Sequence, residues 1–330
     1  MLNRQKPTTR VYTESLYNST LLMNLFARLR ALIVIGLVLP LSACLFSSHK
    51  VQSNISTAPL KSATKDELIQ IINSEAEKIR TLNATVDIDT SVGGAKRGKV
   101  TEYKEIRGYV LVRKPSMLRM IGLMPIVRNR AFDMVSDGDN FKLWIPPKNK
   151  FIVGRNDVVR PSNEPLASIR PQQIYDALLL QYIGADEIAV LENGSEMTLD
   201  AKNHRWMEQS DYELDVIRRS SNGWYLDRKI VFDRVNLIPD REFIYDQNGN
   251  VVTDTHYKDV KEYGSVRFPS VIQIWRPQEE YSIVLTIVKM TVNEPIRDEQ
   301  FALQQPPGSQ LERLDQTPQT SALNPVQQQH

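Results

Sequence analysis

The stretch TKDELIQIINSEAEKIRTLNATVDID, residues 64–89, changes from a helical to a strand-like pattern within one segment. Thr64 and Glu67 form a capping box at its start. The apolar residues that follow fall on one face of a helix: Leu68, Ile72, Ala76 and Ile79. From residue 82 to residue 89, apolar and polar residues alternate, which is typical of a half-buried strand. The segment therefore predicts an amphipathic helix that leads directly into a sheet.

The rest of the chain is dominated by strand patterns. Asp137-Gly138-Asp139-Asn140 and Asn248-Gly249 are turn signals between strands. One further helix is predicted at residues 171–182, with Pro171 in its first turn and Gly184 after its end. The predicted strands cover residues 82–89, 100–112, 117–121, 131–136, 141–145, 187–191, 196–201, 212–219, 224–233, 241–245, 251–260, 267–276 and 281–292.

The ratio of strands to helices indicates how the chain folds. A long antiparallel sheet twists and curls, and two helices are too few to cover both of its faces. We therefore predict an α+β, mainly β fold. Its curved antiparallel sheet of about eleven strands forms a half-open barrel, with helices covering its mouth and an apolar cavity inside.

A basic and then apolar segment precedes the single cysteine of the chain. Arg28 and Arg30 precede an apolar run at residues 31–39. Leu41-Ser42-Ala43 then leads into Cys44. This order is typical of a secretory signal. The run is shorter than the roughly 20 residues of a membrane-spanning helix. A signal anchor or a buried structural cysteine is the alternative interpretation.

Leu41-Ser42-Ala43-Cys44 resembles the lipobox of bacterial lipoproteins. The resemblance implies that residues 1–43 are a cleaved signal peptide, and we expect translation to start at Met23. It also implies that Cys44 carries a diacylglyceryl group and usually an N-terminal acyl chain, which together give stable anchoring. No Asp follows the cysteine, which in this family favours the outer membrane. We therefore expect a lipid-anchored protein of the bacterial envelope, at the outer membrane and facing the periplasm.

The composition of the flanking segments sets the expected domain boundaries. Residues 44–63 are rich in Ser, Thr, Asn and Lys and predict a flexible tether. Residues 304–330 are rich in Gln and Pro and predict a disordered tail. One domain, residues 64–303, lies between them. The 41 Lys and Arg residues nearly balance the 39 Asp and Glu residues, so no global field would attract nucleic acid.

Several C-terminal features follow one another in a specific order. Residues 245–252, YDQNGNVV, form a hairpin signal, and Phe268-Pro269 introduces a strand at residues 271–275. A last strand is followed by FALQQPPG at residues 301–308. This order resembles the LolA and LolB lipoprotein carriers and related lipid-binding lipoproteins, and the resemblance implies a concave face that binds acyl chains. Because LolA itself has no lipid anchor, Cys44 favours a LolB-like or lipid-transfer relative.

The sequence contains no pattern of catalytic or metal-binding residues. A nucleophile elbow, a phosphate loop and a dinucleotide fingerprint are all absent. Metal-ligand spacing is absent among the four histidines, which are His49, His204, His256 and His330. We therefore expect no enzyme, no cofactor and no metal site. A catalytic group assembled from distant strands is the alternative.

Five apolar side chains on the central strands are candidates for lining the predicted cavity: Met117, Met134, Phe141, Trp144 and Phe151. Methionine side chains adapt to varied ligands, which suits a lipid cavity. The alternative is that these residues are ordinary core beneath the helices.

An apolar segment occupies a position where a turn is expected. Residues 121–127 read IGLMPIV between two predicted strands, whereas connections normally face water and are polar. Exposed apolar loops of LolB-like proteins touch the acceptor membrane, so the resemblance implies the same role here. The predicted membrane-contact residues are Leu123, Met124, Ile126, Arg128 and Arg130. The alternative is that the segment continues a buried strand.

Together these patterns favour an anchored envelope lipoprotein. Its half-barrel would bind the acyl chains of lipids or acylated lipoprotein cargo, for transport or outer-membrane insertion, without covalent chemistry. The alternative function is a structural or sensory envelope lipoprotein that uses the same fold to bind a protein partner. An envelope hydrolase is a third and weaker candidate.

Overall fold

The computed structural model describes residues 54–55, 59–94, 96, 98–158, 169–200 and 204–315. The predicted signal peptide, the predicted lipidation site Cys44, most of the predicted tether and residues 316–330 lie outside the described residues. Within the described ranges, no helix is long and apolar enough to cross a membrane.

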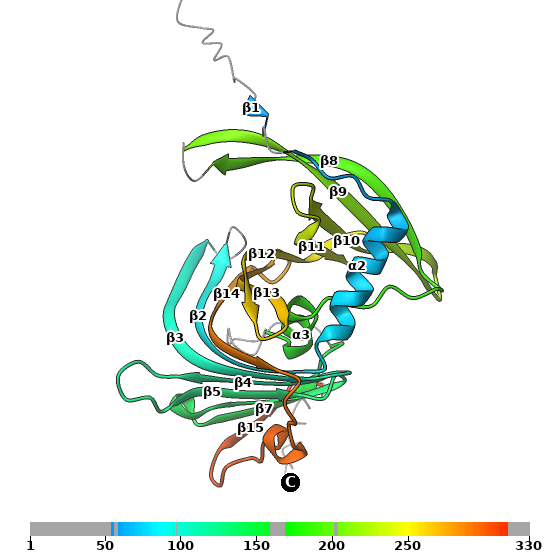
Figure 1. The fold of residues 1–330 in the computed structure, drawn as a ribbon. Coiled ribbons are helices and arrows are strands. Elements are labelled where there is room, and N and C mark those ends of the chain that lie inside the picture. The colour runs from blue at the N-terminus through cyan, green and yellow to red at the C-terminus, as the bar shows by residue number, and fades with distance from the viewer. Residues whose placement is uncertain are drawn as a thin grey trace, which may run out of the picture. The chain divides into compact units, whose positions relative to one another are not determined.

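The described chain forms one curved sheet of fifteen strands, which does not close into a barrel (Figure 1). In chain order its elements are β1 (Asn54–Ile55), α2 (Lys65–Lys78), β2 (Thr81–Gly94), β3 (Lys99–Arg113), β4 (Met117–Leu123), β5 (Arg130–Ser136), β6 (Asn140–Ile145), η2 (Pro146–Lys148), β7 (Lys150–Arg155), α3 (Pro171–Leu178), β8 (Ile188–Asp200), β9 (Arg205–Ser220), β10 (Gly223–Asp233), β11 (Ile238–Tyr245), β12 (Val251–Tyr263), β13 (Val266–Arg276), β14 (Tyr281–Val292), η4 (Asp298–Phe301) and β15 (Gln310–Arg313). The predicted mainly β fold with an open, curved sheet is confirmed.

Two antiparallel meanders meet in the middle of this sheet. The first runs from β2 to β7 and the second from β8 to β14. They join where β14 pairs with β2, from Tyr281 opposite Val92 to Val292 opposite Leu82. The two halves of the chain therefore share one sheet, and residues from both halves can line one site on its face.

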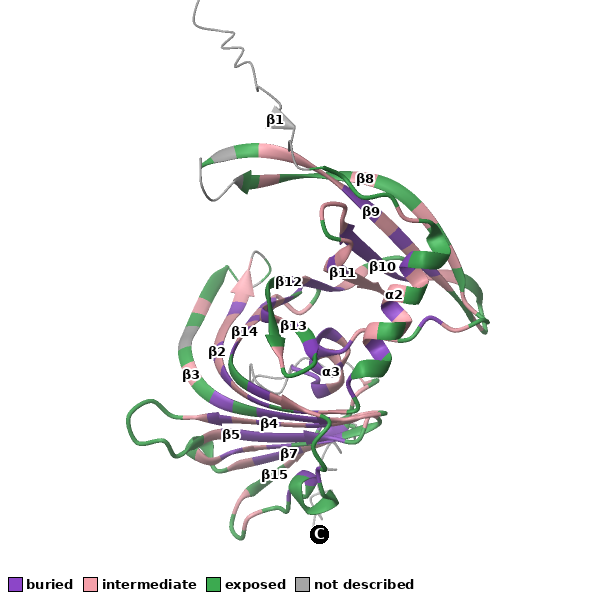
Figure 2. Cartoon of the chain, viewed as in Figure 1, coloured by how far each residue is buried: buried purple, intermediate pink, exposed green. Residues whose placement is uncertain are grey.

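Both helices pack on the same face of the sheet (Figure 2). Leu68 and Ile72 of α2 are fully buried against β9 and β10. The predicted capping box is present, with the backbone N–H of Thr64 donating to Glu67 Oε2 at 2.7 Å. The face is traced by residues that lie opposite one another on successive strands: Leu214, Ile230, Glu242, Thr255, Ile274 and Ile283. A glutamate therefore lies in the middle of a buried row.

The second helix is shorter than the sequence predicts. It ends at Leu178, and the next residues are extended, instead of continuing to residue 182. The guanidinium of Arg228 donates to the carbonyl oxygens of Gln181 and Tyr182, both at 3.0 Å. These tertiary hydrogen bonds satisfy backbone groups outside the helix, so the chain can leave it early.

The domain extends beyond the predicted boundary at residue 303. Residues 304–315, which the composition assigns to a disordered tail, include β15, which pairs in parallel with β7. Leu314 is buried in the main core. The sequence of β15, QLER, has too few apolar residues to predict a strand. It forms one here because it pairs with β7. The pattern also misses β1 and β7, and it divides the continuous β8 into two strands.

Candidate functional site

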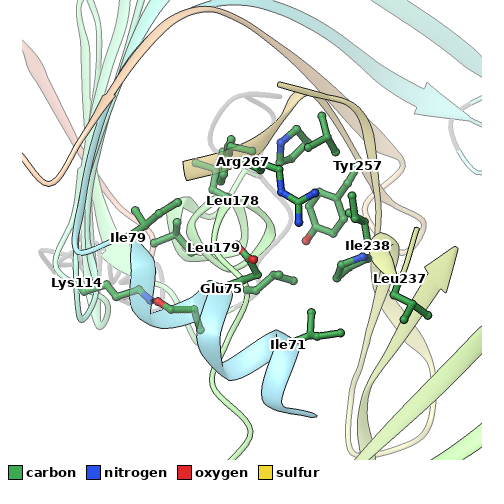
Figure 3. A pocket seen from close by; sticks show the side chains of 16 residues that line it. Ile71, Glu75, Ile79, Lys114, Leu178, Leu179, Leu237, Ile238, Tyr257 and Arg267 are labelled. Atoms are coloured by element: carbon green, nitrogen blue, oxygen red, sulfur yellow. Dashed lines mark hydrogen bonds between the residues drawn. The ribbon is translucent and has the colours of Figure 1, made fainter. Parts of the chain in front are cut away.

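A groove lined mainly by apolar side chains opens between α2, the end of α3 and strands β11 to β13 (Figure 3). Its empty volume is about 760 Å³, including the part that is open to solvent. We call it the apolar groove. Its lining residues are Ile71, Glu75, Ala76, Ile79, Lys114, Leu178, Leu179, Leu180, Leu237, Ile238, Pro239, Tyr257, Val260, Arg267, Phe268 and Pro269.

Local features of the chain place three of the residues that line the apolar groove. The apolar face of α2 is wider than one stripe, so Ile71 reaches the groove while Leu68 and Ile72 pack into the neighbouring core. The chain straightens after α3, which places Leu179 in the wall. Leu237 has a positive φ of 62° in the turn before β11, where its N–H donates to the carbonyl of Asp233 at 2.7 Å.

Three charged side chains lie around the apolar lining. Glu75 pairs with Lys78, with Nζ and Oε1 2.6 Å apart. Lys114 donates to the backbone carbonyl of Ala76, and burial lowers the pKa of its ammonium group. Arg267 is exposed on β13, and its side chain extends over the groove in Figure 3. The groove thus combines an apolar wall with charged groups, as amphiphilic ligands require.

A buried carboxyl group lies beneath the groove. The hydroxyl of Tyr257 donates to Glu242 Oε2 at 3.0 Å, and Glu242 is only 1% exposed. Burial raises the pKa of Glu242 to about 7. The charge of Asp176 on α3 raises the pKa of Glu242 further, and burial raises the pKa of Asp176 itself to about 6. Tyr257 lines the groove, so a titratable carboxyl group is hydrogen-bonded to one of its lining residues.

We expect Glu242→Gln to stabilise the protein at pH 8. The folded state holds a proton on Glu242 that the unfolded chain releases between its ordinary pKa of 4.5 and about 7. Stability therefore falls as the pH rises through this range, by about 1.4 kcal/mol per pH unit for one such carboxyl. Melting temperatures at pH 5 and pH 8 test this, with the exposed Glu262→Gln as the matched control. An unchanged pH dependence in Glu242→Gln would show that Glu242 does not titrate abnormally.

The five predicted cavity residues do not all line one cavity. Met117, Phe141 and Phe151 line a second hollow beside β6, β7 and β15, whereas Met134 and Trp144 are not part of its lining. Met134 and Phe141 lie in the main core on the helix-covered face. Met117, Trp144 and Phe151 lie on the opposite face, against the segment that follows β14. Successive side chains of a strand point to opposite faces, so residues 141 and 144 of β6 cannot share one. None of the five lines the apolar groove, and their predicted role in ligand binding stays a prediction.

The sequence patterns do not identify the groove-lining residues as a site, although Ala76 and Ile79 belong to the predicted apolar face of the helix. The available signal was the excess of apolar residues in α2, where Ile69 and Ile71 widen the stripe that Leu68 and Ile72 begin. A stripe of this width indicates contacts on two sides of a helix. The remaining walls carry no comparable signal.

The segment between β4 and β5 is an exposed apolar loop. Ile126 is 98% exposed and adopts a positive φ of 68°, which is uncommon for a β-branched residue. Met124 and Val127 are also exposed. Leu123 is instead the half-buried last residue of β4. The segment therefore does not continue a buried strand.

The two predicted arginines of this loop differ in their surroundings. Arg128 is exposed. Arg130 pairs with the buried Asp133 at 3.0 Å, and its guanidinium lies 6.0 Å from the ring centre of Trp144. Arg130 is thus held by the sheet, whereas Arg128 extends from the loop itself.

Comparison with known proteins finds distant structural similarity. No family model and no curated protein sequence matches the chain. A solved LolA superfamily protein from Nitrosomonas europaea is 15% identical, with a TM-score of 0.44, over 71% of this chain and 97% of that one. An outer membrane lipoprotein-sorting protein domain from Vibrio parahaemolyticus is 13% identical, with a TM-score of 0.42, over 72% and 97% of the two chains. A DUF1329 family protein from Desulfovibrio piger is 13% identical, with a TM-score of 0.44, over 72% and 95%.

Proposed function

We propose that this protein is a lipid-anchored lipoprotein of the bacterial envelope that holds an acyl chain in the apolar groove. The observation that carries the proposal is the groove itself, whose walls combine Ile71, Leu179, Ile238 and Phe268 from four separate segments of the chain. The protein acts without covalent chemistry, as a carrier or acceptor of acylated molecules.

An acyl chain that leaves water in an apolar groove can bind with useful strength. Each methylene group contributes about 0.8 kcal/mol, so a chain of about sixteen methylenes contributes about 13 kcal/mol. The cost of association, at least about 4 kcal/mol, leaves a net free energy of about 8 to 9 kcal/mol, which corresponds to a dissociation constant near 1 μM. Binding in the micromolar range would allow the protein to take up and release its cargo.

The proposed anchor is Cys44, and the exposed loop between β4 and β5 is the proposed second contact with a membrane. Ile126 and Met124 would enter the acyl region, and Arg128 would face lipid phosphates. A large apolar side chain contributes roughly 1.5–3 kcal/mol when it is fully buried. A basic residue near an anionic surface contributes about 1 kcal/mol.

We expect Met124→Glu combined with Ile126→Glu to weaken binding of the non-lipidated protein to anionic liposomes by more than tenfold. The melting temperature should change little, because both side chains are exposed and surface substitutions usually change stability by no more than about 0.5 kcal/mol. Liposome sedimentation of the full chain with Cys44→Ser measures the effect, and Val100→Glu, at an exposed position on β3, is the control. Equal losses in both variants would remove the loop from the proposal.

Native mass spectrometry of the purified full chain with Cys44→Ser tests the proposed function. We expect a population whose added mass corresponds to a bound lipid and which is lost after delipidation. A protein that is free of lipid but retains an envelope protein through purification would favour the alternative, in which the fold binds a protein partner.

A further inference from the structure

The rim of the apolar groove carries positive side chains that form no ion pair with other described residues. Arg267 lies on β13 and is exposed, and Figure 3 shows its side chain extending over the groove. Within the described part of the chain, no hydrogen bond or ion pair engages its guanidinium. Glu262 lies opposite Arg267 in the β12–β13 register but makes no ion pair with it. The guanidinium is therefore available to a ligand.

Lys114 supplies a second positive charge in the lining. Its ammonium group donates to the carbonyl of Ala76 and has three donors in all. The ammonium group is half-buried, and burial lowers its pKa although the charge of Glu77 acts in the opposite direction. A ligand anion would stabilise that charge further.

The negative side chain of the lining does not balance these cations. Glu75 pairs with Lys78 on the same helix, with Nζ and Oε1 2.6 Å apart. Glu77 near Lys114 and Glu262 opposite Arg267 lie outside the lining. Arg267 and Lys114 outnumber Glu75 among the lining residues, so the lining itself carries one net positive charge beside an apolar wall. This combination matches a molecule that has an acyl chain at one end and an acidic group at the other.

We propose that the apolar groove takes an acyl chain with an acidic head group, a carboxylate or a phosphate, and that Arg267 binds this group at the rim. A guanidinium can donate two parallel hydrogen bonds to either anion. The inference rests on the proposed function and narrows its cargo to anionic lipids. The diacylglyceryl group of a lipoprotein has no acidic head group, so it lacks the feature that Arg267 would recognise.

Binding of oleate and of oleyl alcohol to the full chain with Cys44→Ser separates the head group from the chain. We expect oleate to bind at least about tenfold more tightly than the alcohol, because a charged hydrogen-bonded contact changes affinity by this order. Arg267→Gln should weaken oleate binding by about the same factor and leave the alcohol unchanged. Lys258→Gln, at an exposed position on β12 outside the lining, is the matched control and should change neither.

Oleoyl lysophosphatidylglycerol distinguishes the two sources of the anion. Its binding should also depend on Arg267, and the tighter of the two anionic probes identifies a carboxylate or a phosphate as the preferred head group. Equal binding of oleate and oleyl alcohol to the unsubstituted groove would overturn the inference without requiring any groove variant to fold. Failure of all three probes to bind would instead contradict the proposed function.

Discussion

Replacing Ile71 by glutamate should weaken acyl-chain binding by at least about a hundredfold. Ile71 is half-buried on α2 and lines the apolar groove, as Figure 3 shows. A carboxylate at this position would lose its hydration when an acyl chain binds, which costs several kcal/mol. Each 1.4 kcal/mol is about a tenfold change in affinity.

A second glutamate on the same helix controls for charge and for helix stability. Ser74 is exposed and outside the lining, so Ser74→Glu should leave binding unchanged. Displacement of a fluorescent fatty acid from the full chain with Cys44→Ser gives both affinities, and circular dichroism shows whether each variant is folded. If folded Ile71→Glu binds as tightly as Ser74→Glu, the acyl chain does not lie in this groove.

Replacing Cys44 by serine should abolish metabolic labelling with palmitate and release the protein from the membrane fraction. The thiol is the acceptor that the lipobox resemblance implies, and the chain has no other cysteine. A serine hydroxyl does not replace it in that processing. Because anchoring depends on two or more acyl chains, their loss should remove stable membrane attachment.

Labelling in whole cells, followed by separation of membranes from soluble material, measures both effects. Ser47→Ala, three residues after the cysteine, is the control and should keep the label. Palmitate that remains on Cys44→Ser would show that another residue is acylated, and the proposed anchor would then be wrong.

The local signals of this sequence predict most of the secondary structure. The capping box at Thr64 marks the start of α2, and the last predicted strand, residues 281–292, has the bounds of β14. Such elements are set by neighbouring residues. In contrast, the end of α3 depends on hydrogen bonds from Arg228, and β15 depends on its pairing with β7. Contacts between distant segments decide these features, so a local pattern cannot predict them.

The groove is harder to predict than the fold for the same reason. Its walls come from separate parts of the chain, and residues such as Leu179 and Ile238 resemble any other apolar residue. Large side chains such as Trp144 are conspicuous in the sequence, yet the pleat of β6 directs Trp144 away from the helix-covered face. The exposed loop around Ile126 was easier to identify, because an apolar run in a turn contradicts the usual polarity of loops.

Titration of a fluorescent fatty acid into the full chain with Cys44→Ser tests the central claim most directly. We expect saturable binding of one probe per chain near micromolar concentration, with displacement by unlabelled oleate. Absence of saturable binding at high micromolar probe, in protein shown to be folded, would contradict the assignment of the apolar groove as an acyl-chain site.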